Sequence, residues 1–202
     1  MKRTSNHSEQ RLFREEVLSF TREICVCAHL TQTRDALEKC AEMVINMQYS
    51  LEHHIMTETE KQIVCSWKYP NEYALYNLPT YDEMKAKKLG FMNPASANNY
   101  HSFYDKDIFA GFVNILEEAT EVFIGIGTNP DYCNQGYGQQ MLQIAYEFSK
   151  SQHPAKPLYL EVREWNKRAI HCYEKAGFVI DGTPYQLETS IGSGTFYRMT
   201  RK

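Results

Sequence analysis

What the sequence lacks narrows the classes of protein that it can encode. No apolar run approaches the roughly 20 residues of a membrane-spanning helix, and the net charge of −3 gives no electrostatic argument for binding nucleic acid or an anionic membrane. There is no internal repeat and no low-complexity tract. The six cysteines are scattered and no secretory leader precedes them, so we expect reduced thiols in a cytoplasmic protein.

The composition that remains is ordinary for a folded domain. The 202 residues are 43% hydrophobic and 23% charged, enough for one domain plus an appendage. A metal site is not expected. Cys25 and Cys27 form a C-x-C with His53 and His54 downstream, but a structural zinc site needs four convergent ligands. Free cysteine is more commonly a small buried hydrophobe.

The first sixty residues have helical periodicity. Thr33 is a plausible N-cap between two apolar stripes. The stripes consist of Phe13, Val17, Phe20 and Ile24, and of Leu37, Cys40, Val44, Met47 and Leu51. We therefore predict a helical N-terminal extension over residues 1–60, serving as a docking or oligomerisation element, for example in a homodimer.

From residue 61 onward the pattern predicts a mixed α+β domain. The predicted strands cover 62–69, 101–105, 108–118, 121–128 and 158–162, and a hairpin over 178–187 and 194–200. The predicted helices cover 81–90, 136–152 and 166–177, with glycines at the ends of the first and last. This order of elements indicates a mixed sheet flanked by helices.

The loop with the sequence CNQGYG, residues 133–138, precedes a predicted helix. The first amides of a helix have no intrahelical acceptor, and the helix dipole places partial positive charge there. Gly136 and Gly138 let the main chain approach an anion closely. A diphosphate is therefore a suitable ligand, and an ordinary Gly-rich turn is the alternative.

A second segment, LEVREWNKRAIHCYEKAGF, follows about thirty residues later, and the two together resemble the acetyl-coenzyme A signature of the GCN5-related N-acetyltransferase (GNAT) superfamily. The resemblance covers roughly residues 60–202 and rests on the Q/R-x-x-G-x-G/A loop and on five later positions: Asn166, Ala169, Tyr173, Gly177 and Phe178. It implies a mostly antiparallel sheet flanked by helices, with residues 61–202 as the acetyltransferase domain. LEVR is most similar to bacterial ribosomal-protein N-terminal acetyltransferases.

The resemblance assigns the residues that bind acetyl-CoA. Main-chain groups of Ile126, Gly127 and Thr128 would face the pantetheine arm and the acetyl carbonyl, and Asn166 would also contact pantetheine. The diphosphate would lie on the loop, whose residues are Cys133, Asn134, Gln135, Gly136, Tyr137, Gly138 and Gln139. Cys133 departs from the family pattern, because that position usually holds Arg or Gln.

The resemblance also assigns the acid and the base. Tyr173 would protonate the departing thiolate; a tyrosine packed in the core is the alternative. Glu161 would take the proton from the attacking amine, and strand alternation allows it to point away from the apolar face. An ion pair with Arg163 or another cation is the alternative, and Glu121 is the reserve base.

The sequence does not identify the amine that accepts the acetyl group. Trp67, Tyr69, Tyr73 and Tyr76 could line a substrate cleft, and core packing explains Trp67 equally well. LEVR favours a peptide α-amine, whereas the alternatives are a small amine such as a polyamine, amino sugar or antibiotic. A non-catalytic module that senses acetyl-CoA or docks a partner is the rival from a different class.

Overall fold

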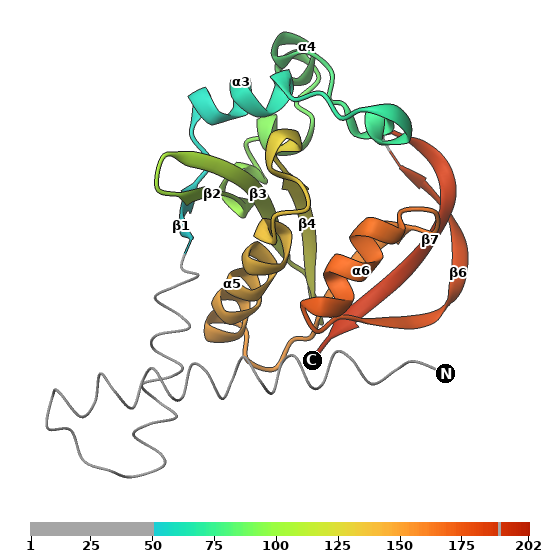
Figure 1. Cartoon of the computed structure of the whole chain (residues 1–202). Helices are drawn as coiled ribbons and strands as arrows, with labels where there is room; N and C mark the ends of the chain where they lie inside the picture. Colours follow the sequence, from blue (N-terminus) through green and yellow to red (C-terminus); the bar gives the residue numbers. More distant parts are fainter. Residues whose placement is uncertain (1–50, 190) are drawn as a thin grey trace, which may run out of the picture. The chain divides into compact units, whose positions relative to one another are not determined.

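A computed structural model describes residues 51–189 and 191–202 as one compact unit that begins at Leu51 (Figure 1). The helical stripes predicted before Leu51, with Cys25 and Cys27, lie outside the described residues. The strands are β1 (Glu52–Ile55), β2 (Tyr100–Asp105), β3 (Ile108–Glu117), β4 (Val122–Thr128), β5 (Leu158–Arg163), β6 (Val179–Thr189) and β7 (Gly192–Arg201). The helices are α3 (Glu58–Ser66), α4 (Tyr81–Ala86), α5 (Tyr137–Gln152) and α6 (Lys167–Lys175), and four 3₁₀ turns are η1 (Asn71–Tyr76), η2 (Gly90–Met92), η3 (Ala97–Asn99) and η4 (Pro130–Tyr132).

The strands form one seven-stranded sheet in the order β1-β2-β3-β4-β5-β7-β6. Every neighbouring pair is antiparallel except β4 and β5, which run parallel. The predicted α+β class with a mixed, mostly antiparallel sheet flanked by helices is therefore confirmed. In the part of the chain that the structure covers, no helix is both long and apolar enough to cross a membrane.

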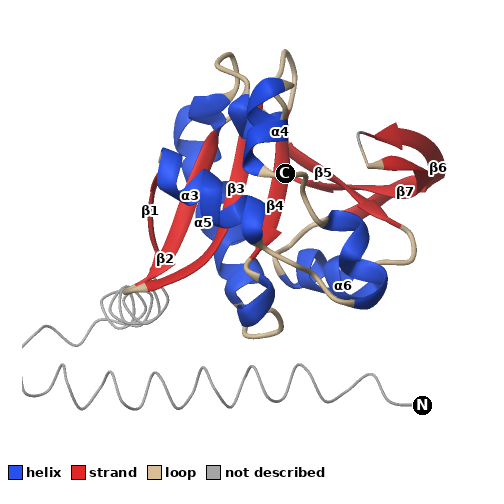
Figure 2. Ribbon diagram, turned by 90° about the horizontal axis from the view of Figure 1, so that it is seen from above, coloured by secondary structure: helices blue, strands red, loops and turns tan. Residues whose placement is uncertain are grey.

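The sheet opens between β4 and β5. Only Val122 with Leu158 and Phe123 with Tyr159 are paired, although β4 continues to Thr128 and β5 to Arg163. Figure 2 shows β5 and β7 turning away from β4, with α6 on their side of the opening. Two groups of strands therefore diverge from a short shared segment.

Two apolar clusters pack on opposite faces of β2 and β3, because neighbouring residues of a strand face opposite sides. Phe103 packs in the larger cluster, which α5 and α6 cover, whereas its neighbour Tyr104 packs against the smaller cluster under α3 and α4. The larger cluster holds α5 firmly against β3 and β4, so the start of α5 is fixed beside the end of β4.

The N-terminal edge of the domain corrects two predictions. The segment 62–69, predicted as a strand, lies mostly in α3, because Thr57 and Glu60 form a capping box and the helix buries Val64 and Cys65. Residues 52–55, predicted as part of a helical extension, form β1 and pair with β2. Leu51 packs in the larger core rather than on a separate helical stripe.

The remaining elements follow the predictions closely. The helix predicted to close at Gly90 ends at Ala86, because Lys88 adopts a left-handed conformation with φ of 51°. Asn166 caps α6 as predicted, and Gly177 follows that helix with φ of 84°.

Candidate active site

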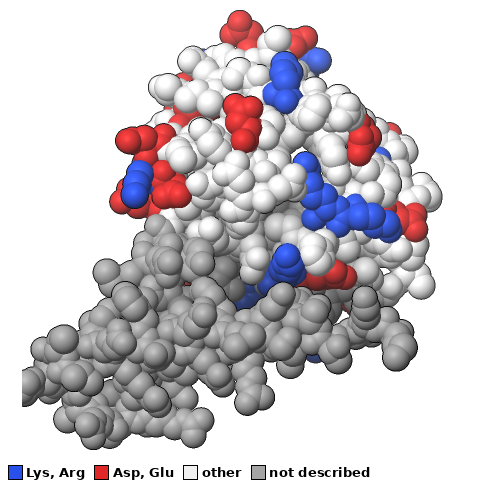
Figure 3. Space-filling model, viewed as in Figure 1, with Lys and Arg blue, Asp and Glu red and all other residues white. Residues whose placement is uncertain are grey.

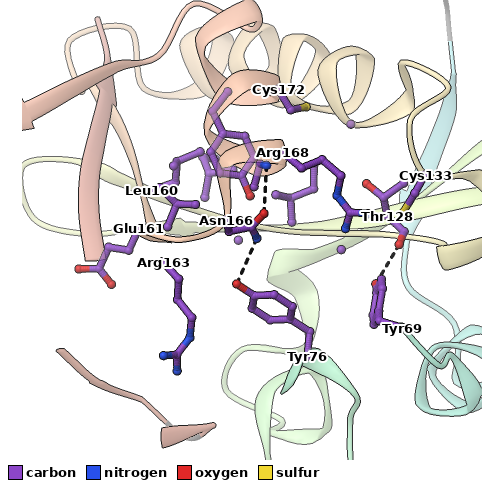
Figure 4. Close-up of a pocket in the computed structure, with 18 of the residues that line it drawn as sticks. Tyr69, Tyr76, Thr128, Cys133, Leu160, Glu161, Arg163, Asn166, Arg168 and Cys172 are labelled. Carbon is purple, nitrogen blue, oxygen red and sulfur yellow. Dashed lines mark hydrogen bonds between the residues drawn. The ribbon is translucent and has the colours of Figure 1, made fainter. Parts of the chain in front are cut away.

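A cavity of about 670 Å³ lies where β4 and β5 separate (Figure 4). Its walls come from β4, β5, the loop before α5, the helix α6 and the segment that contains η1. The opening in the sheet therefore creates a space that is lined both by main chain and by titratable side chains.

The hydrogen bonds at the two ends of β4 fix which main-chain groups face this space. The Val122 amide donates to the Pro157 carbonyl, on the β5 side, whereas the Asn129 amide donates to the Ala110 carbonyl, on the β3 side. Successive residues of a strand direct their amides and carbonyls to opposite neighbours. The even-numbered residues of β4 therefore face β5, from which the strand diverges.

Of the three predicted β4 residues, Ile126 and Thr128 direct their main-chain groups toward the opening, whereas those of Gly127 are directed to β3. The Thr128 carbonyl accepts a hydrogen bond from the Tyr69 hydroxyl at 2.8 Å. Gly127 serves packing, because a Cβ there would overlap the Phe112 ring. All three residues line the cavity.

The loop before α5 exposes main-chain amides at the cavity wall. Asn134 and Gly136 both have left-handed backbones, with φ of 64° and 85°. Gly136 is the N-cap of a 16-residue helix, and no side chain of the described residues caps that end, so the first amides of the helix stay free. A Cβ on Gly138 would lie 3.0 Å from Cys172 Sγ, so glycine allows α5 and α6 to approach closely here.

Most of the predicted loop residues line the cavity, and two do not. The lining residues are Cys133, Asn134, Gly136, Gly138 and Gln139. The side-chain amide of Gln135 donates to the Asp131 carbonyl at 3.4 Å, and the Tyr137 hydroxyl donates to Asp105 Oδ2 at 2.9 Å. These two side chains therefore point elsewhere.

Asn166 uses both ends of its buried side-chain amide. Its Oδ1 accepts from the Ala169 amide at 3.1 Å and caps α6, and its Nδ2 donates to the Tyr76 hydroxyl at 3.1 Å (Figure 4). The side chain therefore ties the start of α6 to η1 across the cavity.

Tyr173 lines the cavity one helical turn beyond Ala169. Burial, together with the neighbouring Cys172 thiol, raises the pKa of Tyr173 above its ordinary value. Among the described residues its hydroxyl has no hydrogen-bond partner. The phenol therefore carries its proton at neutral pH and is free to donate it to a ligand.

Glu161 lines the cavity from β5. Its Oε1 accepts a hydrogen bond from the Tyr185 hydroxyl at 2.5 Å, and burial followed by this bond raises the pKa of Tyr185 to about 12. Oε2 has no partner within the described chain. One oxygen is thus held in place while the other is left for a proton.

The two alternatives weighed for the base are placed differently. The Arg163 guanidinium donates to the carbonyls of Gly192 and Ser193, at 2.9 and 3.2 Å, rather than to Glu161. Glu121 does not line the cavity, and its Oε1 lies 2.5 Å from Arg198 Nη2. The reserve base is therefore engaged in an ion pair away from the cavity.

The aromatic residues predicted for the acceptor divide between wall and core. Tyr76 and Trp67 line the cavity, although Trp67 is only 8% exposed and packs against Phe109 in the smaller cluster. Tyr73 does not line it, but its ring lies against Trp165. Trp67 therefore both lines the cavity and packs in the core.

Sequence reasoning missed Arg168, which lines the cavity from α6 with its guanidinium carbon 3.9 Å from the centre of the Tyr73 ring. It lies inside the motif, two residues after Asn166, and its basic charge in that segment was the available signal. Figure 3, which is viewed as in Figure 1, shows basic side chains gathered over the region of α6. Arg163, Arg168 and Lys175 line the cavity, whereas Glu161 is the one acidic side chain among the described residues that line it.

Comparison with known proteins gives a family match and relatives that share part of the chain. Residues 61–178 match the model of the acetyltransferase (GNAT) family. The uncharacterized N-acetyltransferase YfmK of Bacillus subtilis is 32% identical over 87 residues, which cover 40% of this chain and 53% of that protein. The chain therefore spans about half the length of this curated relative.

Solved structures share the fold. The ribosomal-protein-S18-alanine N-acetyltransferase of Escherichia coli matches with a TM-score of 0.53 and 20% identity, over 75% of this chain and 93% of that one. The structure of AAC(6')-Ib in complex with ribostamycin and coenzyme A matches with a TM-score of 0.57 and 17% identity, over 76% and 93%. At such identities the likeness concerns the fold alone.

Proposed function

The chain belongs to the acetyltransferase (GNAT) family, as predicted from its sequence, and from this premise we propose that it transfers an acetyl group from acetyl-CoA to a primary amine by direct attack. The observation that carries the proposal is the cavity at the opening of the sheet. The residues that line it include the loop with free amides at the start of α5, Tyr173 with its hydroxyl and Glu161 with its carboxylate. These are the groups that the reaction needs.

The cavity fits coenzyme A in three respects. The left-handed turns at Asn134 and Gly136 and the uncapped start of α5 offer amides to a diphosphate. Gly138 keeps the space in front of Thr128 and Cys172 free of a side chain. The β4 groups of Ile126 face the opening, where a pantetheine amide can replace the missing strand partner.

The chemistry divides among three groups of the chain. Acetyl-CoA supplies an acyl thioester that a neutral amine can attack. Glu161 Oε2 takes the proton from the incoming ammonium, and the Ile126 amide faces the place where negative charge develops on the carbonyl oxygen. Tyr173 gives its proton to the leaving sulfur. Proton removal and proton delivery therefore come from different elements, β5 and α6.

The charges of the lining bear on the acceptor. A polyamine or an amino sugar with several ammonium groups needs several carboxylates, and in the part of the chain that the structure covers Glu161 is the one acidic side chain lining the cavity. The Arg163 guanidinium, which also lines the cavity, would repel a second ammonium group. We therefore favour an acceptor with a single amine, a peptide α-amine above all, over a polycation.

A kinetic screen tests this function. The protein is incubated with acetyl-CoA and a panel of short peptides, a polyamine and an aminoglycoside, and thiol release is measured with and without each amine. We expect amine-dependent thiol release with at least one peptide and slower release with the polycations. Tight coenzyme A binding without turnover on any amine would instead favour a sensing module.

A further inference from the structure

The loop before α5 contains no cation of its own. Residues 130–139 include Asp131 as their one charged side chain, and no Lys or Arg. A diphosphate on this loop would therefore meet main-chain amides but no formal positive charge from the same segment. Since a charge that leaves water is stabilised best by a paired opposite charge, the cation should come from another element of the cavity.

Arg168 is placed to supply that charge. It lies on α6, lines the same cavity, and in Figure 4 its side chain extends toward Thr128 and Cys133. Its positive charge acts to lower the pKa of the Cys133 thiol, against the larger effect of burial, which raises it. Two separate observations thus bring the guanidinium to the loop.

The contacts of Arg168 leave its hydrogen-bond donors free. The Tyr73 ring covers one face of the guanidinium, with its central carbon 3.9 Å from the ring centre. Stacking of this kind uses the face of the planar group and leaves the N–H donors at its edge. Within the described chain no carboxylate or carbonyl accepts from them. Such an edge matches the paired oxygens of a phosphate.

The other cations of α6 are placed differently. Lys175 also lines the cavity, and its carbonyl accepts a hydrogen bond from the Gln139 side-chain amide at 3.4 Å, so it lies beside the first turn of α5. Arg168, by contrast, is the cation whose charge acts on Cys133, the position that lacks one. The Lys167 amine lies 5.9 Å from the centre of the Tyr197 ring and does not line the cavity. Arg163 is occupied by the two hairpin carbonyls.

We propose that Arg168 binds the diphosphate of coenzyme A and replaces, from α6, the cation that the loop at Cys133 lacks. This proposal rests on the proposed function, since it needs coenzyme A in the cavity. It makes the cofactor site a joint product of the loop and of a helix that follows it by about thirty residues.

Calorimetric titration of the full chain with coenzyme A, without any acceptor, tests the proposal. Arg168→Ala is expected to weaken coenzyme A binding about 10- to 100-fold, because a charge-assisted bidentate contact is lost. Binding of 3′-dephospho-coenzyme A should weaken by the same factor, because the diphosphate is retained in that probe. Lys167→Ala on the same helix serves as the matched control and should change either affinity by less than about twofold.

Further variants sharpen the assignment. Arg168→Gln keeps the length of the side chain without its charge and should behave like Arg168→Ala, while circular dichroism checks that both variants fold. Adding Cys133→Arg to Arg168→Ala should restore part of the lost affinity by returning a cation to the loop.

The outcomes separate this proposal from the function on which it rests. If the wild-type protein does not bind coenzyme A, the proposed function fails. If the wild type binds and Arg168→Ala binds equally tightly, only the assignment of Arg168 is wrong. A loss seen with coenzyme A but absent with the 3′-dephospho form would also overturn it, because the contact would then be to the 3′-phosphate.

Discussion

Two polar clusters of the same sheet differ in how completely their groups are paired. At the β1–β2 edge the Glu60 carboxylate is 5% exposed and accepts from the Thr57 amide at 2.7 Å and from Ser102 Oγ at 2.9 Å. His54 Nε2 lies 2.8 Å from its other oxygen. At the β4–β5 opening, the Tyr173 hydroxyl and the Arg168 guanidinium have no hydrogen-bond partner in the part of the chain that the structure covers.

The difference separates structural groups from groups that await a ligand. Burial acts to raise the pKa of Glu60, but hydrogen bonds from Thr57, Tyr104 and Ser102 outweigh it and lower that pKa to about 2. For Tyr173 burial raises the pKa and no hydrogen bond opposes it. We therefore expect changes at Glu60 to affect stability and changes at the opening to affect turnover.

The largest expected effect is at Tyr173. Tyr173→Phe removes the proposed acid without changing shape, so kcat should fall about 100- to 10,000-fold. The dissociation constant for coenzyme A and the melting temperature should change little, because the hydroxyl has no hydrogen-bond partner among the residues that the structure describes. Steady-state kinetics measure kcat, titration measures the dissociation constant, and thermal melting measures the stability. Tyr146→Phe is the control, because the Tyr146 hydroxyl donates to the Lys202 carbonyl instead. An unchanged kcat in Tyr173→Phe would show that Tyr173 is not the acid.

The next effect concerns Glu161. Glu161→Gln keeps an acceptor for the Tyr185 hydroxyl but cannot take a proton, so kcat/KM for the amine should fall about 100-fold. Tyr185→Phe is the matched variant: it removes the hydrogen bond and leaves the carboxylate, and should cost only a few-fold by the same reasoning. If both variants lose the same amount, Glu161 acts through the position of Tyr185 and not as the base.

At the paired cluster the effect should fall on stability. Glu60→Gln loses charge-assisted hydrogen bonds, and the free energy of unfolding at pH 7 should drop by about 2–3 kcal/mol. Because the folded-state pKa is lowered, the stabilisation by Glu60 is present above its ordinary value of 4.5 and is lost as the pH falls toward about 2. Urea denaturation at pH 7, 4 and 3 should therefore show the difference from wild type shrinking.

Two results would contradict this account of Glu60. One is a difference from wild type that stays constant down to pH 3. The other is an equal loss in Glu52→Gln, whose side chain is exposed on the neighbouring strand. Turnover of the folded Glu60→Gln protein should match that of wild type.

The smallest expected effect concerns Arg163, whose side chain is paired within the structure and also lines the cavity. Arg163 is 5% exposed, lines the cavity and holds the hairpin carbonyls of Gly192 and Ser193. A Cβ on Gly194 would overlap its guanidinium, so Gly194→Ala should displace Arg163 and raise the acceptor KM about 3- to 10-fold, with a loss of stability of about 1 kcal/mol. Kinetics measure the acceptor KM and thermal melting measures the stability, with Ser193→Ala as the control. A wild-type KM in Gly194→Ala would show that the hairpin does not shape the acceptor site.

Local signals made much of the fold and of the candidate site predictable from the sequence. Asn166 and Gly177 mark the ends of α6 by a side-chain cap and a left-handed turn, and both operate within a few residues. The loop with Gly136 is similarly local. Alternation along β5 predicted that Glu161 can point away from the apolar face, and Glu161 lines the cavity, but alternation could not say what the carboxylate contacts.

The predictions that failed depended on distant partners. The β-branched residues Ile63 and Val64 favour a strand locally, yet a capping box starts a helix before them, and that helix buries Val64 in the smaller cluster and leaves Ile63 exposed. The strand β1 exists because β2, almost fifty residues away, supplies its hydrogen bonds.

The sequence by itself determined the family, the order of the elements from β2 onward and the loop–helix motif, because caps, glycine turns and alternation act over a few residues. The tertiary structure decided which side chains meet: the Tyr185 hydroxyl with Glu161, Glu121 with Arg198, and Arg168 with the Tyr73 ring at the opening. These partners are 24, 77 and 95 residues apart, and the divergence of β4 from β5 opens the cavity that Arg168, of the last pair, lines.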